Sequence, residues 1–523
     1  MSDKRSTDES NGEETDEAIP MPDAEAGGAD ETWDDAVASE NDEVADDEAE
    51  PTADDAEAGD AADSEWPSEE DAEPTASGSA TPVRDTEDQR KWFVIGVGGT
   101  GGNLLDGILL RRDTLEQERN WLSAVWDAGI QGYGSLNTHK TELAETYWAA
   151  TIKDNDVEDY VFGPGRGAGT NDKKGQEYAE EAFRVGDPFS YWNDINLQQV
   201  QQASAVMFLH SVVNGTGSGA TPTVARELND EVFSTGEIAM MSQENPVYSA
   251  VVLPSAGESG SDGGIKKKNA AVGLARMAKH VDAIVPFENS HLKTSEMTVA
   301  VDGAEDYFRN YVRENKSLLA FLEAFSMSAI PQTGESDRKV RGNMFDVSDP
   351  IDPLDGINPL GLSPDEQPAH VLAPAYNRIR ASEFTSDVLE RLVAATLSYN
   401  GKLVDFDETT AWGGPFLFIC PPGTVTQVRD VVERHLNDII EDRDFLDVGD
   451  DEEILTTRNY VEVPEVEDYR LWVTLWNPEM PAMDRFHEYA TDKLENGGFY
   501  SSRLEEYATD IENLFGQLGR EVL

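Results

Sequence analysis

The chain has 523 residues, and its 104 Asp and Glu against 40 Lys and Arg give a formal net charge of −64 at pH 7. A chain of this length buries a sizeable core and can hold two or three domains. So negative a charge argues against a nucleic-acid partner, because phosphates are met by Lys and Arg. Cys420 is the only cysteine, which excludes an internal disulfide. Because no apolar run approaches the roughly 20 residues of a membrane span and no N-terminal segment resembles a signal peptide, we expect a cytoplasmic protein without a transmembrane segment.

Residues 1–90 carry 33 Asp and Glu against 4 Lys and Arg, with almost no aliphatic side chains between them. Such a segment buries too little apolar surface to offset the entropy of ordering it, so we predict a disordered acidic tail that can engage a protein partner. The remaining residues still have a net charge of about −35, which fits a cytoplasm at molar salt, where charge repulsion is screened. The composition therefore predicts a halophilic source.

Folded sequence is expected from Lys91, where KWFVIGVGGTGGNLLDGILLRR predicts a strand, a glycine-rich turn and a helix. Its Gly96–Gly101 segment satisfies G-x-G-x-x-G, the dinucleotide fingerprint, and Asp127 lies about where a ribose-binding acid would end the next strand. An NAD(P)-dependent oxidoreductase is therefore one hypothesis at this point.

Two further glycine clusters follow predicted strands: NGTGSGATP after Ala205–Leu209, and Gly260–Gly264 after PVYSAVVLPSAG. Strands alternate with helices over this region, which predicts a doubly wound, mainly parallel α/β domain with its ligand crevice at the carboxyl ends of the strands. Glycine lets successive backbone N–H groups approach an anion, and several such loops suit a nucleoside di- or triphosphate. No G-x-x-x-x-G-K-[ST] sequence is present, so a P-loop enzyme is disfavoured.

Four ordered motifs resemble those of the tubulin/FtsZ superfamily of filament-forming GTPases. GVGGTGGN is similar to the first phosphate loop of that family, and LNTHKTEL to its second loop. GRGAGTNDKKGQEYAEE is similar to the family segment GxGAGGNPxxGxxAAEE, and NGTGSGATP stands where the family has GGGTGTGAAP. The resemblance implies a GTP-binding domain over residues 91–292, with bound GTP and Mg²⁺.

The resemblance also implies which residues bind the nucleotide. The first loop would surround the inner phosphates, the segment at Ala168 the terminal phosphate, and the Asn214 loop would supply an N–H cradle at a helix N-terminus. Five further residues correspond to family positions that contact the ribose or the base: Asp262, Lys266, Asn289, Ser386 and Asp387. The implied phosphate-side residues are Gly98, Gly99, Thr100, Gly101, Gly102, Asn103, Ala168, Gly169, Thr170, Asn214, Gly215, Thr216, Gly217, Ser218 and Gly219.

Beyond residue 292 the resemblance predicts an insertion over 293–376, then a central helix and an acidic loop over 377–410. SEFTSDVLERLVAATL is the predicted central helix, and KLVDFDETT resembles the family's synergy loop NxDxxD/E. Asp405 and Glu408 take its two acidic positions as implied catalytic residues, whereas Leu403 replaces the asparagine. Residues 411–523 would form a smaller α+β domain.

The leading hypothesis is a cytoskeletal GTPase that assembles into filaments, hydrolyses GTP between subunits, and serves cell division or cell shape. A GTP-binding regulator that does not polymerise is the alternative, and the oxidoreductase ranks below both. His139, His210 and His280 do not have metal-ligand spacing, so no metal site is predicted from side chains alone.

Overall fold

The computed structural model describes residues 91–118, 129–152, 157–185, 199–200, 203–229, 245–257, 263–308, 311–328, 341–342, 347–354, 357–441, 458–463 and 466–520. The predicted acidic tail, residues 1–90, lies outside the described residues, and so do Asp127 and Asp262.

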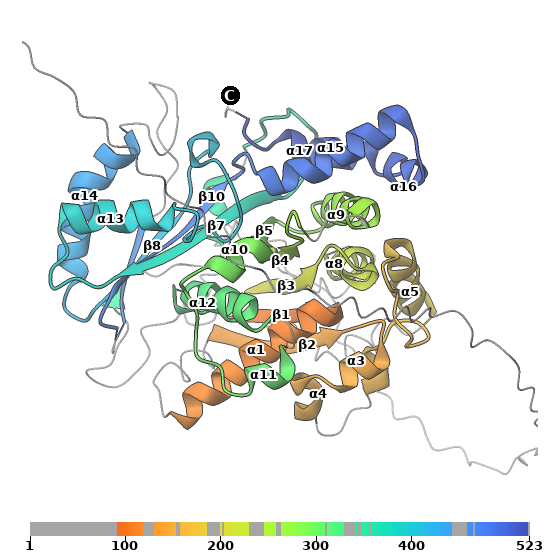
Figure 1. Cartoon of the computed structure of the whole chain (residues 1–523), viewed down its shortest axis with the longest axis horizontal. Helices are drawn as coiled ribbons and strands as arrows, with labels where there is room; N and C mark the ends of the chain where they lie inside the picture. Colours follow the sequence, from red (N-terminus) through yellow and green to blue (C-terminus); the bar gives the residue numbers. More distant parts are fainter. Residues whose placement is uncertain are drawn as a thin grey trace, which may run out of the picture. The chain divides into compact units, whose positions relative to one another are not determined.

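The strands form one sheet of ten, in the order β2-β1-β3-β4-β5-β7-β10-β8-β9-β6 (Figure 1). Their bounds are β1 Trp92–Val97, β2 Ile130–Leu136, β3 Ala205–Ser211, β4 Val247–Leu253, β5 Ala283–Glu288, β6 Arg341–Gly342, β7 His370–Ile379, β8 Phe416–Cys420, β9 Arg458–Glu462 and β10 Tyr469–Trp476.

Helices and short helical turns connect these strands. The helices are α1 Gly98–Gln117, α3 Lys140–Ala144, α4 Tyr147–Thr151, α5 Asp172–Val185, α8 Thr221–Asn229, α9 Gly263–Met277, α10 Asn289–Thr294, α11 Ala304–Tyr307, α12 Val312–Ser328, α13 Ser386–Thr396, α14 Val425–Glu441, α15 Pro481–Asn496, α16 Ser501–Glu505 and α17 Ala508–Gly516. The turn used below is η2 Thr216–Ala220.

The first half of the sheet is parallel throughout, from β2 to β5. Every residue of β1, β3, β4 and β5 is buried, as expected for parallel strands that helices cover on both faces. The predicted doubly wound α/β architecture is confirmed. All of these strands therefore end at the same edge of the sheet.

The second half of the sheet mixes strand directions. β7 pairs in parallel with β5 only at Ala283↔His370 and Ile284↔Val371, and it then pairs in antiparallel fashion with β10 along its length. β10 also pairs in antiparallel fashion with β8, which pairs in parallel with β9. A mainly parallel sheet with an α+β C-terminal part is confirmed.

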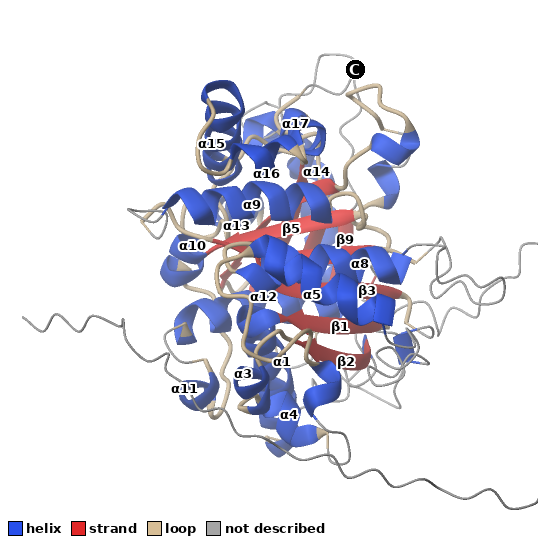
Figure 2. Ribbon diagram, turned by 90° about the vertical axis from the view of Figure 1, so that its right-hand side faces the viewer, coloured by secondary structure: helices blue, strands red, loops and turns tan. Residues whose placement is uncertain are grey.

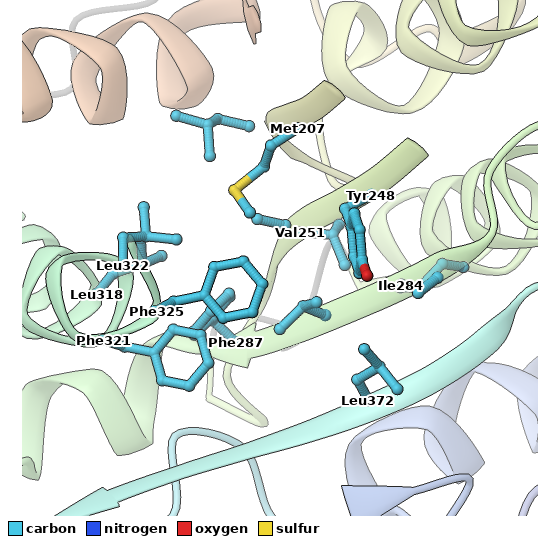
Figure 3. Close-up of a cluster of buried hydrophobic side chains, with 14 of the residues drawn as sticks. Met207, Tyr248, Val251, Ile284, Phe287, Leu318, Phe321, Leu322, Phe325 and Leu372 are labelled. Atoms are coloured by element: carbon cyan, nitrogen blue, oxygen red, sulfur yellow. The ribbon is translucent and has the colours of Figure 1, made fainter. Parts of the chain in front are cut away.

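Helix α12 belongs to the core, although it lies within the segment that was predicted as an insertion. Its Phe321 and Phe325 point toward Met207 of β3, Phe287 of β5 and Leu372 of β7 (Figure 3), and Phe321 and Phe287 meet edge to face with ring centroids 5.3 Å apart. Burying a side chain of this size contributes about 2–3 kcal/mol, so α12 joins the two halves of the sheet. The predicted boundaries at 292, 376 and 410 stay predictions.

Helices α15, α16 and α17 pack on α9, which lies over the parallel half of the sheet (Figure 2). The C-terminal segment thereby reaches the loops that follow β3 and β4.

Candidate functional site

A cavity of about 620 Å³ opens where the parallel strands end. This volume lies in the range of small-molecule and cofactor sites, and the position is the one expected for ligands of open α/β sheets. Most of the predicted binding residues line it: Gly98, Gly99, Thr100, Asn103, Ala168, Gly169, Thr170, Asn214, Thr216, Gly217, Lys266 and Asn289.

The first set of donors in the cavity is the N-terminus of α1. The chain turns from β1 into α1 at Gly98, whose φ of 73° favours glycine. Val97, the residue before the helix, makes no side-chain hydrogen bond to cap it. The N–H groups of the first turn have no partner within a helix, so Gly98, Gly99 and Thr100 present free donors and the positive end of a 20-residue helix to the cavity.

The second set of donors is η2, a turn of π-helix that runs directly into α8. Single π-helical turns are found frequently at functional sites. The carbonyl of Gly217 accepts a hydrogen bond from Nδ1 of the fully buried His210 (3.2 Å), whose Nε2 accepts one from Ser249 (2.7 Å). Burial lowers the pKa of His210 to about 4, so the ring stays neutral and holds the turn in place.

The third set of donors is the loop that precedes α5. Gly167 and Gly169 have φ values of 81° and 59°, and Asn269 of α9 donates to the carbonyl of Thr170 (2.8 Å). The N–H of Gly215 donates to the carbonyl of Gly169 (2.7 Å), which ties this loop to η2. Within the described part of the chain, the N–H groups of Gly169 and Thr170 have no hydrogen-bond partner, so they too are available to a ligand.

Thr138 joins the second and third sets. Its hydroxyl accepts a hydrogen bond from the N–H of Ala168 (3.0 Å) and lies 2.5 Å from the hydroxyl of Thr216. Its carbonyl accepts from the N–H of Gly167 (2.7 Å). A fully buried side chain thus fixes the spacing between the two loops before any ligand binds.

The far end of the cavity has a different chemistry. Asn289 and Leu292, which follow β5, lie there with Tyr311 and Asn315 at the start of α12. Tyr311 is 43% exposed, although it is a large aromatic residue. Amides and an aromatic ring suit a flat heterocycle that both donates and accepts hydrogen bonds.

Charged side chains are few in this cavity, despite the acidity of the chain. Arg166 and Lys266 are the lining cations among the described residues, and Glu142 is the lining carboxylate. Glu142 accepts a hydrogen bond from Asn137 (3.1 Å), and its own N–H donates to Nδ1 of His139 (3.1 Å). Among the described residues, no group of three or more His, Cys, Asp and Glu could hold a metal ion by itself.

A buried ionic cluster lies beside the third set of donors. Asp172, the first residue of α5, contacts Nζ of Lys268 from α9 and Nε of Arg503 from α16, the latter at 3.0 Å. Burial by itself raises the pKa of Asp172, but the two cations outweigh this effect and hold the pKa below its usual range. The cluster connects the C-terminal helices to the loop at Gly169.

Several predicted residues act in packing instead of lining this cavity. A Cβ at Gly101 would lie 2.1 Å from the carbonyl oxygen of Leu209, and one at Gly219 would lie 2.0 Å from that of Asp172. Gly215 is also packed on backbone, since a Cβ there would lie 2.5 Å from the oxygen of Asn171. Ser218 donates to the carbonyl of Asn214 (2.6 Å). Their glycine or small-residue character reflects close backbone approach.

Gly102 lines a smaller neighbouring cavity of about 260 Å³. Asp106, Glu142, Glu145 and Asp306 also line it, and burial raises the pKa of Asp106 to about 6.

Ser386 and Asp387 are not brought to the cavity. They begin α13, which packs on β7, α14 and β10 beside the C-terminal half of the sheet (Figure 1). The residues that reach the cavity from this part of the chain are Tyr311 and Asn315 at α12, whereas the assignment of α13 as the central helix stays a prediction. Residues 293–376 are predicted as an insertion, and within them the aromatic face of α12 packs on the strands.

Asp405 and Glu408 lie on the loop after α13, and they do not line the cavity. Glu408 pairs with Nζ of Lys402 at 2.5 Å. Leu403 is fully buried, and its carbonyl accepts a hydrogen bond from the N–H of Glu288 at the end of β5 (2.9 Å). The loop is therefore anchored to the parallel half of the sheet.

Residues 91–296 match the Tubulin/FtsZ family, GTPase domain. These residues form a tubulin/FtsZ-family domain. The curated protein Tubulin-like protein CetZ5 of Haloferax volcanii is 25% identical over 280 residues, which is 53% of this chain and 60% of CetZ5. Tubulin-like protein CetZ3 of the same organism is 30% identical over 215 residues, 41% of this chain and 47% of CetZ3. The chain thus spans about half to three-fifths of these relatives.

Solved structures share the fold of residues 91–296, and the structural similarity extends beyond these residues. CetZ2 from Haloferax volcanii, solved as a GTPγS-bound protofilament, superposes with a TM-score of 0.52 at 17% sequence identity, covering 78% of this chain and 99% of CetZ2. Among the described helices, none is both long and apolar enough to cross a membrane.

Sequence reasoning missed several residues that line the cavity. Glu142 belongs to LNTHKTEL, a quoted motif, so its position next to the phosphate loops was within reach of the sequence. Tyr311 and Asn315 open a helix with a strongly apolar face, and that face was the available signal that α12 belongs to the core. Arg166 stands between two glycines within a quoted motif.

Proposed function

We propose that this protein binds GTP with Mg²⁺ in the cavity at the strand ends, assembles into filaments, and hydrolyses GTP where two subunits meet. The observation that carries the proposal is the division of one cavity into two ends. Three sets of unpaired backbone N–H groups gather at one end, and two asparagines with a tyrosine gather at the other. A nucleoside polyphosphate has the same division, with anionic oxygens at one end and a heterocycle at the other.

The phosphate end suits a polyphosphate because its donors belong to the backbone. The phosphate oxygens would accept hydrogen bonds from the backbone N–H groups of Gly98–Thr100, Gly169–Thr170 and Thr216–Gly217. Glu142 would hold Mg²⁺ together with those oxygens, since Mg²⁺ in such sites is bound by one or two carboxylates plus phosphates. When bound, Mg²⁺ neutralises charge on the transferred phosphoryl group.

The other end suits guanine. Asn289 and Asn315 each offer an amide that donates and accepts, as the O6 and N2–H₂ groups of guanine require. Tyr311 would stack on the ring. Lys266, which lies between the two ends on α9, would contact the ribose or a phosphate.

Hydrolysis at a subunit interface is proposed from the family resemblance. Asp405 and Glu408 of one subunit would face the terminal phosphate of the next and orient the attacking water. The solved CetZ2 relative is a GTPγS-bound protofilament, which supports assembly of this chain by analogy. We further propose that the protein is cytoplasmic and acts in cell shape or cell division. Residues 1–90 would bind a protein partner.

A GTP-binding regulator that does not polymerise is the second candidate, and sedimentation with and without GTP at molar KCl separates the two. An NAD(P)-dependent oxidoreductase leaves the donors of η2 and of the loop at Gly169 without a role.

Thr100→Glu tests nucleotide binding without an expected loss of fold. Thr100 lies in the first turn of α1, where an acidic residue favours the helix, yet its carboxylate would repel the phosphates. We expect wild type to bind fluorescent GTP more tightly than ATP at molar KCl, and Thr100→Glu to lose binding while its thermal midpoint stays unchanged.

Thr100→Gln is the matched control, because it has the same size without the charge and should retain most of the binding. Wild-type affinity in Thr100→Glu, or a preference of the wild type for NAD, would contradict the proposal.

A further inference from the structure

We propose that Arg166 distinguishes a nucleoside triphosphate from a diphosphate in this cavity, by pairing its guanidinium with the terminal phosphate. The inference rests on the proposed function and deepens it, since it assigns a specificity-determining side chain to a site otherwise built from backbone N–H groups.

The strand order gives the cavity a direction. The sheet runs β2-β1-β3-β4-β5, and the asparagines and the tyrosine lie at the β5 end and on α12. The N-termini of α1 and η2 follow β1 and β3 in the middle of this order. Arg166 lies in a loop hydrogen-bonded to the segment that follows β2, at the opposite end from the base. A nucleotide lying across the strand ends would therefore place its last phosphate toward Arg166.

The backbone around Arg166 is held on both sides. Gly165 and Gly167 have φ values of 74° and 81°, which favour glycine. The carbonyl of Gly165 accepts from the N–H of Lys140 (2.9 Å), and the N–H of Gly167 donates to the carbonyl of Thr138 (2.7 Å). Arg166 and His139 form a β-bridge between these two hydrogen bonds. The position of the arginine backbone is thus set before a ligand arrives, which reduces the entropic cost of binding.

The guanidinium of Arg166 is exposed and has no hydrogen-bond or ion-pair partner among the described residues. Arg111 pairs with Glu323, Arg485 with Glu288, and Arg503 with Asp172. Arg166 instead lines the cavity with no hydrogen bond or ion pair. Arginine presents several N–H donors in a fork that matches phosphate geometry, and such charge-assisted hydrogen bonds are stronger than neutral ones.

The test compares GTPγS and GDP, because the two ligands differ in the terminal phosphate. Affinities are measured by titration of the full chain at molar KCl with Mg²⁺. We expect Arg166→Gln to weaken GTPγS binding on the order of 10- to 100-fold and to leave GDP binding within about twofold of wild type. Arg166→Lys, which keeps the charge and loses the fork, should fall between wild type and Arg166→Gln.

Lys173→Gln is the matched control. Lys173 is an exposed cation near the start of α5 that does not line the cavity, so its removal changes the net charge equally and should alter neither affinity. Equal losses of GTPγS and GDP in Arg166→Gln, or no loss of either, would overturn the inference while the proposed function stands. Failure of the wild type to bind both ligands would instead overturn the proposed function, and the inference with it.

Discussion

Replacing Asp172 by asparagine should destabilise the fold more than replacing its partner Lys268 by methionine. Asp172 is 1% exposed and Lys268 is 4% exposed, and Nε of Arg503 lies 3.0 Å from the second carboxylate oxygen of Asp172. The buried cluster therefore contains one anion and two cations. The two substitutions leave different charges behind.

The magnitude follows from that charge balance. Asp172→Asn leaves the buried Lys268 without an anion and leaves Arg503 only the half-exposed Glu506 (2.7 Å), and uncompensated buried charge of this kind costs about 3–5 kcal/mol. Lys268→Met leaves Asp172 paired with Arg503 one to one and fills the space with an apolar side chain. This second change should cost about 1.5–3 kcal/mol, the net value of a hydrogen bond to a charged group.

Urea unfolding at molar KCl, followed by tryptophan fluorescence, measures both variants against wild type. The pKa of Asp172 lies below its usual range in the folded state, so its contribution is present at neutral pH and is lost as pH falls through the folded pKa. The comparison therefore belongs at pH 7. A Lys268→Met variant that costs as much as Asp172→Asn would refute the charge-balance reasoning and point to packing as the main role of the cluster.

Three further predictions concern the neighbouring elements. Gly217→Ala places a Cβ 2.0 Å from the carbonyl oxygen of Ser211, so the folded state should lose about 3 kcal/mol or more; a urea midpoint equal to that of wild type would contradict this packing. Because burial lowers the pKa of His210 from 6.5 to about 4, the unfolded chain binds a proton more readily, and stability falls as pH drops from 6.5 toward 4. His210→Asn should remove up to about 3 kcal/mol of that pH dependence, seen as a smaller shift of the urea midpoint between pH 7 and pH 4.5. Glu408→Gln breaks the 2.5 Å pair with Lys402 and should bind GTPγS as wild type does. With GTP, this variant should release phosphate slowly and form longer-lived filaments; GTP turnover at the wild-type rate would remove Glu408 from the mechanism.

The local sequence determined the elements that build the phosphate end of the cavity. An apolar strand followed by closely spaced glycines predicts a tight turn into a helix, and Gly98 and the η2 turn have that structure. Alternation of strands and helices then requires the strand ends to share one edge, because parallel strands need crossover connections of fixed hand. These properties depend on near neighbours in the chain, so a single sequence reveals them.

The tertiary structure alone decided which distant segments complete the cavity. Helices α12 and α13 both show apolar faces, and sequence periodicity does not say which strands each face covers. The aromatic residues Phe321 and Phe325 pack beside Phe287 of β5 (Figure 3) and on Trp472 of β10. This packing places Tyr311 and Asn315 at the cavity, whereas Ser386 lies outside it. Contacts between residues so far apart in the chain depend on the shape and volume of the whole core, and not on the spacing of residues in either helix.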